Sequence, residues 1–142
     1  MNFIVKSFND LTKTELYEIL KIRSQIFIVE LKMNCLEIDG MDYSALHFFL
    51  EEDGKILAYL RAFKEEKSLK IGRVLSACHN KGYGTNLMQK TMLYARQNLG
   101  LEKIILDSQK QAVKFYQKLG FKRVSDEFLE EGVPHFKMEI CL

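Results

Sequence analysis

The sequence has few cysteines, three in 142 residues: Cys35, Cys78 and Cys141. They lie too far apart in the chain for a zinc-binding motif, and their odd number argues against a framework of disulfide bonds. We therefore expect no metal site. Free thiols are most simply explained by a reducing compartment, so the sequence favours a cytoplasmic protein.

An excess of charge of one sign is also lacking. The net charge is +2 at neutral pH and the lysines are scattered, so nothing in the composition indicates a nucleic-acid partner. No apolar run approaches the length of a membrane span, and the opening segment Met1–Lys6 is too short for a signal peptide. We expect neither a nucleic acid nor a membrane as partner.

Internal repeats, linkers and low-complexity segments are absent as well. The hydrophobic content of 47% and the charged content of 28% are those of an ordinary globular protein. A chain of this length can bury one sizeable core. We therefore expect a single domain over residues 1–142.

The first periodic segment carries a helix-start signature. Thr12 can act as N-cap, Glu15 can close a capping box, and Leu11 can pack on Leu16. Behind this start, apolar residues recur at helical spacing, and Arg23 interrupts the apolar stripe. A long cation in such a stripe either reaches the surface or pairs with a carboxylate, and we expect a structural salt bridge.

An acidic stretch follows, which we expect to be an irregular loop over residues 27–43. Its acids are Glu30, Glu37, Asp39 and Asp42. Acids on a loop are usually solvated. A loop that folds over a cleft can also use them to hold a cationic substrate, so both interpretations stay open.

The middle and the end of the chain predict further strands and two helices. Asp53-Gly54 between two apolar runs is the strongest hairpin signal in the sequence. The predicted strands are residues 3–8, 47–52, 55–64, 68–75, 103–107, 121–124 and 135–140, and the later helices follow Thr85 and span 111–119. This order predicts an α/β fold with a mixed central sheet, an antiparallel meander and helices on both faces.

Two glycines, Gly82 and Gly84, stand where the strand ending at Leu75 gives way to a helix. Glycines at such a junction allow backbone to come very close to a ligand, and a helix N-terminus favours a phosphate. A loop in which the glycines only supply unusual dihedral angles is the alternative. The Walker motif is absent, and the dinucleotide fingerprint fails at Leu87, although Asp107 lies about twenty residues on, so dinucleotide binding remains a weaker alternative.

The chain resembles the GNAT family of N-acetyltransferases. The family's turn has the form [RQ]-x-x-G-x-[GA], and here it reads His79-Asn80-Lys81-Gly82-Tyr83-Gly84, with His79 where Arg or Gln is usual. The later segment Phe115-Tyr116 to Gly120-Phe121 is similar to the family's usual ending. Further stretches, among them Glu37-Ile38-Asp39-Gly40 and Ile71-Gly72-Arg73-Val74, are similar to the ElaA-like branch, and the resemblance covers nearly the whole chain.

The resemblance implies acetyl-coenzyme A (acetyl-CoA) as co-substrate. Its pantetheine arm would pair with the strand edge at Val74, Leu75 and Ser76, where a backbone N–H would polarise the thioester oxygen. Its pyrophosphate would lie on the turn and the helix start. The implied residues there are Asn80, Lys81, Gly82, Tyr83, Gly84 and Thr85. Gln109 would contact the pantetheine, although a surface position is as consistent with the sequence.

The resemblance also implies that Tyr116 is the general acid for the departing thiolate, although its helical face fits a core aromatic equally well. A general base must take a proton from the amine. The resemblance implies Glu30 and His135 as the first candidates, followed by Glu37, Asp39 and His47. A partnership of Glu30 with Arg23 and a strand-edge role for His135 are the alternatives. Cys78 has no nearby base, so we do not expect a nucleophile.

The resemblance therefore implies an acetyl-CoA-dependent N-acetyltransferase. It would move an acetyl group directly, in a ternary complex, to a primary amine of a small molecule or peptide. The acidic loop favours a cationic acceptor such as a polyamine, an amino sugar or a peptide amine. A non-catalytic coenzyme A-binding sensor is the alternative from another class. The sequence leaves the oligomeric state open, a homodimer included.

Overall fold

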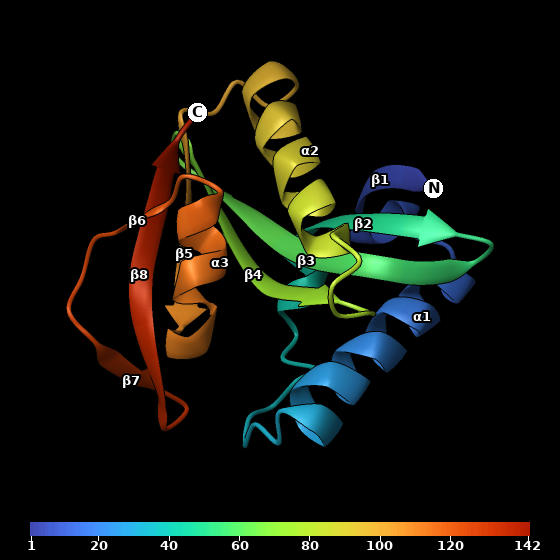
Figure 1. Ribbon diagram of the computed structural model, residues 1–142. Helices are drawn as coiled ribbons and strands as arrows, with labels where there is room; N and C mark the ends of the chain where they lie inside the picture. Colours follow the sequence, from blue (N-terminus) through green and yellow to red (C-terminus); the bar gives the residue numbers. More distant parts are fainter.

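The computed structural model describes all residues from 1 to 142 and builds them around one mixed sheet (Figure 1). The strands are β1 (Asn2–Ser7), β2 (Leu46–Glu52), β3 (Lys55–Glu65), β4 (Ser68–Ser76), β5 (Lys103–Gln109), β6 (Lys122–Arg123), β7 (Phe128–Glu130) and β8 (Val133–Cys141). The helices are α1 (Lys13–Arg23), α2 (Tyr83–Gln97) and α3 (Val113–Lys118). Along the sheet the order is β1-β2-β3-β4-β5-β8-β6, and β7 also pairs with β8.

Strands β1 to β4 form the predicted antiparallel meander. The β2–β3 turn has Asp53 at φ 52° and Gly54 at φ 78°, the left-handed pair that a two-residue hairpin of the favoured twist requires. Only β4 and β5 are parallel, with α2 as their crossover. The predicted α/β architecture is therefore confirmed.

The start of α1 is built as the sequence predicted. The Thr12 hydroxyl accepts a hydrogen bond from the Glu15 N–H at 3.0 Å, and the Glu15 carboxylate accepts one from the Thr12 N–H at 2.8 Å. Lys6 of β1 adds an ion pair to Glu15 at 2.9 Å. The cap thereby fixes where α1 begins and ties the helix to the first strand.

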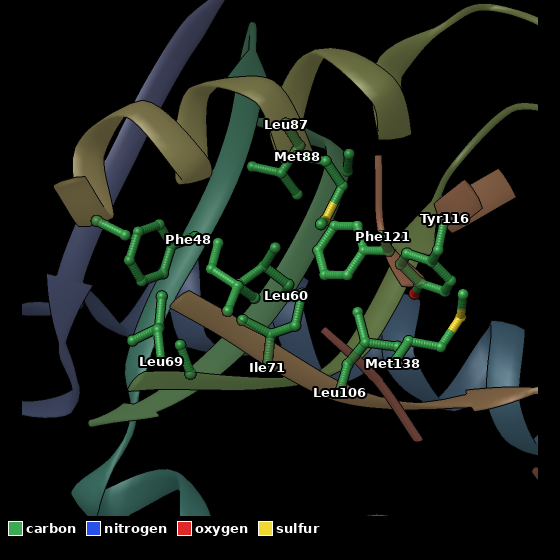
Figure 2. Packing of buried hydrophobic residues seen from close by; sticks show 14 of the residues in the cluster. Phe48, Leu60, Leu69, Ile71, Leu87, Met88, Leu106, Tyr116, Phe121 and Met138 are labelled. Atoms are coloured by element: carbon green, nitrogen blue, oxygen red, sulfur yellow. The ribbon is translucent and has the colours of Figure 1, made fainter. Parts of the chain in front are cut away.

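Alternate residues of the central strands bury themselves on opposite faces of the sheet. Phe48, Leu50 and Leu60 pack with Leu87 and Met88 of α2 in the larger core cluster, which Figure 2 shows from close by. On the other face, six residues form a second cluster around α1: Ile19, Phe27, Phe49, Ile56, Tyr59 and Leu75. Helices thus cover both faces of the sheet, as predicted.

Two expectations about local structure were wrong. Residues 27–30, predicted as irregular, belong to a π-helical extension of α1 over Ser24–Glu30, in which the Leu31 N–H bonds the Ile26 carbonyl five residues back. Residues 26–29 are four consecutive apolar residues, a run that carries no helical period. At the other end, the turn predicted over 130–134 is only two residues, Glu131 and Gly132, both left-handed. Pro134 lies inside β8, near its start, where a missing N–H is tolerated.

No helix of the structure is both long and apolar enough to cross a membrane.

Candidate active site

Strands β4 and β5 pair over only part of their length. Ser68–Ile71 of β4 lies in register with Lys103–Leu106 of β5, and beyond this point neither strand pairs with the other. The rest of β4 bonds only β3, and the end of β5 bonds only β8. The two strands separate towards their C-terminal ends (Figure 1). The facing edge of β4 from Gly72 to Ser76 is therefore open to an added extended chain.

A β-bulge lies on this open half of β4. Tyr59 is in register with Leu75 and Arg61 with Gly72, so that Leu60 faces two residues, Arg73 and Val74. Such a bulge removes one residue from the ladder and turns the strand. Arg73 takes up the distortion in a left-handed conformation, φ 53°.

The helix start at the end of β4 carries free backbone donors. Gly82, with φ 74°, is the N-cap of α2, and no side chain caps this end. The first hydrogen bond of α2 runs from the Asn86 N–H to the Gly82 carbonyl. The N–H groups of Tyr83, Gly84 and Thr85 therefore have no partner within the helix, and the helix dipole adds partial positive charge. This is an anion-binding geometry.

Gly84 brings the helix start close to two other elements. A Cβ built on it would lie 3.5 Å from the Phe115 ring of α3 and 3.9 Å from the Ser76 Cβ of β4. Both distances are ordinary van der Waals contacts, so the packing around Gly84 leaves room for a methyl group. Gly82 differs, because its left-handed φ is what turns the chain into the helix.

Tyr116 on α3 is buried against aromatic neighbours. Its ring centroid lies 5.1 Å from that of Phe115 and 5.6 Å from that of Phe121. Burial raises the pKa of the Tyr116 phenol well above its usual value, so the hydroxyl is protonated at neutral pH. The hydroxyl makes no hydrogen bond in the protein, and burial alone accounts for the raised pKa. Tyr116 is thus both a core aromatic and a neutral donor without an internal acceptor.

Gln109 and His135 lie in register on β5 and β8, at the open end of the split. The Gln109 amide donates to the Met33 sulfur at 3.2 Å, which ties the loop after α1 to β5. His135 is buried, and its Nδ1 lies 2.7 Å from the Val133 carbonyl. Because a carbonyl only accepts, Nδ1 donates, and Nε2, 3.3 Å from a Glu130 oxygen, is the nitrogen at which His135 could gain or lose a proton.

Glu30 ends the π-helical turn, exposed and without an ion pair or side-chain hydrogen bond. Glu30 therefore does not pair with Arg23, the alternative role that the sequence allowed. Arg23 is fully buried and pairs with Glu37 and Asp42, each at 2.6 Å. The expected structural salt bridge of Arg23 is confirmed, with partners that the sequence did not identify.

The other loop acids are all neutralised by arginines. Asp39 pairs with Arg61 at 2.6 Å and with Arg73 at 3.5 Å. Bonds from Arg61 hold the Asp39 pKa far below its usual range, although partial burial opposes this. Burial alone would raise the Asp42 pKa, but Arg23 and Arg61 outweigh it and the pKa is lowered.

Three arginines therefore balance three carboxylates in what we call the arginine–acid cluster: Arg23, Arg61 and Arg73 with Glu37, Asp39 and Asp42. The interpretation of these three acids as simply solvated is wrong, and none of them is left free to hold a cationic substrate. Paired carboxylates with lowered pKa values, such as Asp39, are also poor proton acceptors.

His47 contacts the backbone of the arginine–acid cluster at Asp42. It is fully buried, its Nε2 donates to the Asp42 carbonyl at 3.0 Å, and its Nδ1 accepts from the Tyr59 hydroxyl at 2.7 Å. Burial lowers the His47 pKa and favours the neutral ring. Both ring nitrogens are thus occupied, which describes a structural histidine.

Four elements converge on the open end of the split. The edge of β4, the start of α2 and the Phe115–Tyr116 segment meet at Gly84, and Gln109 of β5 closes the opposite side. Sequence reasoning missed the loop contacts that join the two halves, Gln109 to Met33 and Arg73 to Glu37. Arg73 belongs to the stretch Ile71–Val74 that is similar to the ElaA-like branch, but nothing in the sequence indicates its left-handed backbone.

Comparison with known proteins decides the family. A family model described as an acetyltransferase (GNAT) domain matches residues 25–142. The chain belongs to the GNAT acetyltransferase family. Within it the chain is ElaA-like: protein ElaA of Escherichia coli is 30% identical over 137 residues, which cover 92% of this chain and 90% of ElaA. A UPF0039 protein of Schizosaccharomyces pombe is 36% identical over 147 residues, covering 100% of this chain and 98% of that relative.

Solved structures agree. The crystal structure of Escherichia coli ElaA superposes with a TM-score of 0.87 at 28% identity and covers 97% of each chain. An acyl-CoA N-acyltransferase from Pseudomonas aeruginosa superposes with a TM-score of 0.88 at 33% identity, over 98% of this chain and 99% of that one. The GNAT protein described here is therefore an enzyme of the acyltransferase class, whose fold supports transfer from acyl-CoA to an amine.

Proposed function

We propose that this GNAT protein is an acetyl-CoA-dependent N-acetyltransferase that moves the acetyl group directly to a primary amine of a small molecule or peptide in a ternary complex. One observation carries the proposal. The unpaired edge of β4 leads straight into the uncapped start of α2, so an open backbone edge and a set of free N–H groups lie side by side. An extended arm that ends in a pyrophosphate matches this arrangement.

The residues present fit coenzyme A. The pantetheine arm would pair with the edge at Val74, Leu75 and Ser76, because these residues have no partner on the β5 side. Its pyrophosphate would accept hydrogen bonds from the backbone of the turn. The proposed donors are Asn80, Lys81, Gly82, Tyr83, Gly84 and Thr85. Lys81 is exposed and would add charge, and Gln109 would contact the arm from β5.

The thioester supplies an acyl group that is activated towards attack by an amine. The chain's contribution would begin at the bulge, where a backbone N–H of Val74 or Leu75 would polarise the thioester oxygen. Tyr116 would then protonate the departing thiolate. Its hydroxyl is protonated and has no acceptor in the protein, so it is free to hydrogen-bond the thiolate, although the raised pKa makes it a weaker acid.

A phenylalanine at position 116 tests the second step. Because the Tyr116 hydroxyl makes no bond in the protein, its removal should leave the melting temperature within about 2 °C. Turnover should fall about a hundredfold, the scale of general acid catalysis. A Tyr116→Phe enzyme with unchanged turnover would remove Tyr116 from the mechanism and leave it as a core aromatic.

Glu30 is the proposed general base, with His135 as the second candidate. Glu30 is exposed and unpaired, whereas His135 is buried with one nitrogen bonded to Val133. Glu30→Gln should remove the acidic limb of the pH–rate profile, and His135→Gln should keep it. The reverse result would assign the base to His135.

We propose that the loop does not select acceptor amines by their charge, because the carboxylates of the arginine–acid cluster are already paired. The three cysteines are free thiols, which is consistent with the proposed reducing, cytoplasmic setting. The primary amine itself would be recognised by groups around Glu30 and the open ends of β4 and β5.

A thiol-release assay with acetyl-CoA and a panel of primary amines tests the proposal. Amine-dependent release supports transfer, and binding of coenzyme A without release favours the sensor alternative. Thermal shift against NAD separates the dinucleotide alternative, since a ligand at a hundred times its Kd adds about 2.7 kcal/mol of stability. Stabilisation by NAD and none by acetyl-CoA would refute the proposal.

A further inference from the structure

The bulge in β4 places its strain on an arginine although a glycine stands beside it. Arg73 has φ 53°, whereas the neighbouring Gly72 is not left-handed. Glycine adopts this conformation freely, and a residue with a side chain does so only when its surroundings enforce it. In Arg73 the side chain makes contacts that offset the cost of this backbone conformation.

Those contacts come from the loop after α1. The Arg73 Nε donates to Glu37 Oε2 at 3.0 Å and lies 2.9 Å from Oε1, and a terminal nitrogen lies 3.5 Å from Asp39. The same loop is bonded to the end of β5 through Met33 and Gln109 at 3.2 Å. Arg73 thus joins the open edge of β4 to a loop that reaches across to β5.

Arg73 is not the sole partner of either carboxylate that it contacts. Glu37 already pairs with Arg23 at 2.6 Å, and Asp39 pairs with Arg61 at 2.6 Å. Removal of the Arg73 side chain would leave each carboxylate with a guanidinium partner and would strand no buried charge. What Arg73 alone supplies is the mechanical link between loop and bulge.

We propose that Arg73 is a positioning residue for acyl transfer, which fixes the direction of the Val74 N–H and couples the loop of Glu37–Asp42 to the β4 edge. The ψ angle of Arg73 sets the plane of the peptide that carries this N–H. With the guanidinium bonded to Glu37 and Asp39, that plane and the loop move together. This inference rests on the proposed function, because it assumes that the thioester lies along this edge.

Arg73→Gly tests the link, since glycine keeps the left-handed backbone without strain and only the side-chain bonds are lost. Glu66→Gly is the matched control. Glu66 is exposed, has φ 55° in the β3–β4 turn, and its side chain is bonded to no part of the loop. Amide hydrogen exchange of both variants without ligand is compared with that of the parent protein, and steady-state kinetics follow.

In Arg73→Gly, the amides of Val74 and of residues 37–42 should exchange at least about tenfold faster, while Glu66→Gly leaves them unchanged. Turnover should fall about tenfold to a hundredfold, with the KM for acetyl-CoA within about threefold, as expected from loss of alignment. Unchanged exchange at Val74 and the loop would overturn the coupling, and faster exchange with unchanged turnover would overturn the positioning role.

Two further arms keep the result decisive. If Arg73→Gly does not fold, Arg73→Asn is measured against the same criteria, because asparagine tolerates the left-handed region. If the parent protein releases no thiol with any amine, the proposed function fails. The hydrogen exchange of the unliganded variants then decides the coupling independently.

Discussion

Replacement of Arg23 by methionine would remove the most deeply buried cation of the protein. The Arg23 side chain is 0% exposed and bonds Glu37 and Asp42 at 2.6 Å each. Removal of one partner from a buried ion pair costs about 3–5 kcal/mol, because the remaining charge is buried without compensation. Here Arg73 still bonds Glu37 and Arg61 still bonds Asp42, so we expect the lower end, about 3 kcal/mol.

For a domain of this size, each kcal/mol shifts the melting temperature by about 3–4 °C. Arg23→Met should therefore melt about 10 °C below the parent protein, measured by differential scanning calorimetry. Lys21→Met is the control from the same helix, because Lys21 is 57% exposed in its ion pair with Glu18. The control should change stability by less than about 0.5 kcal/mol.

The size of the loss also depends on the acids that remain. Arg23→Met combined with Glu37→Gln should recover part of the stability, since one buried negative charge is removed along with its partner. If Arg23→Met melts no lower than Lys21→Met, the arginine–acid cluster does not hold the loop, and the argument about its carboxylates is refuted.

Two further predictions concern pH and the glycine turn. The free energy of unfolding should be constant between about pH 6.5 and about pH 8 and fall at lower pH, because the unfolded chain takes up a proton at His47 that the folded state resists. A second fall should follow as pH drops through about 3.8, because Asp39 and Asp42 have lowered pKa values when folded. Urea denaturation across pH measures both, and His47→Gln should remove the first fall; persistence of that fall would contradict the assignment. Gly82→Ala should cost about 1–2 kcal/mol at its left-handed φ and weaken coenzyme A binding, whereas Gly84→Ala should leave the stability unchanged, since its Cβ meets Phe115 at an ordinary 3.5 Å. Calorimetry of both variants is the check, and equal effects would show that the turn does not depend on the conformation of Gly82.

The features that the sequence predicted well are local ones. The capping box at Thr12 and Glu15 and the Asp53-Gly54 hairpin are each encoded within four residues, and both form as expected. The junction of β4 with α2 at Gly82 is of the same kind. Short-range patterns of this sort bring their own geometry, so they survive in almost any tertiary setting.

The arginine–acid cluster could not be predicted, because its partners are distant in the chain. Arg23 and Glu37 are 14 residues apart, and Arg73 and Glu37 are 36 apart. The sequence does not distinguish a loop acid that is solvated from one that is paired. The pairing depends on how the loop folds back over β3 and β4. The left-handed backbone of Arg73 is likewise a product of the bulge and its contacts.

The central claim is that the backbone of the β4 edge and the α2 start binds coenzyme A, and an NMR titration of the nitrogen-15-labelled protein with coenzyme A tests it most directly. The account predicts that the amide signals of residues 80–85 and 74–76 shift together, with one saturation curve. Signals that stay in place at saturating coenzyme A, or that shift only elsewhere in the protein, would contradict the account.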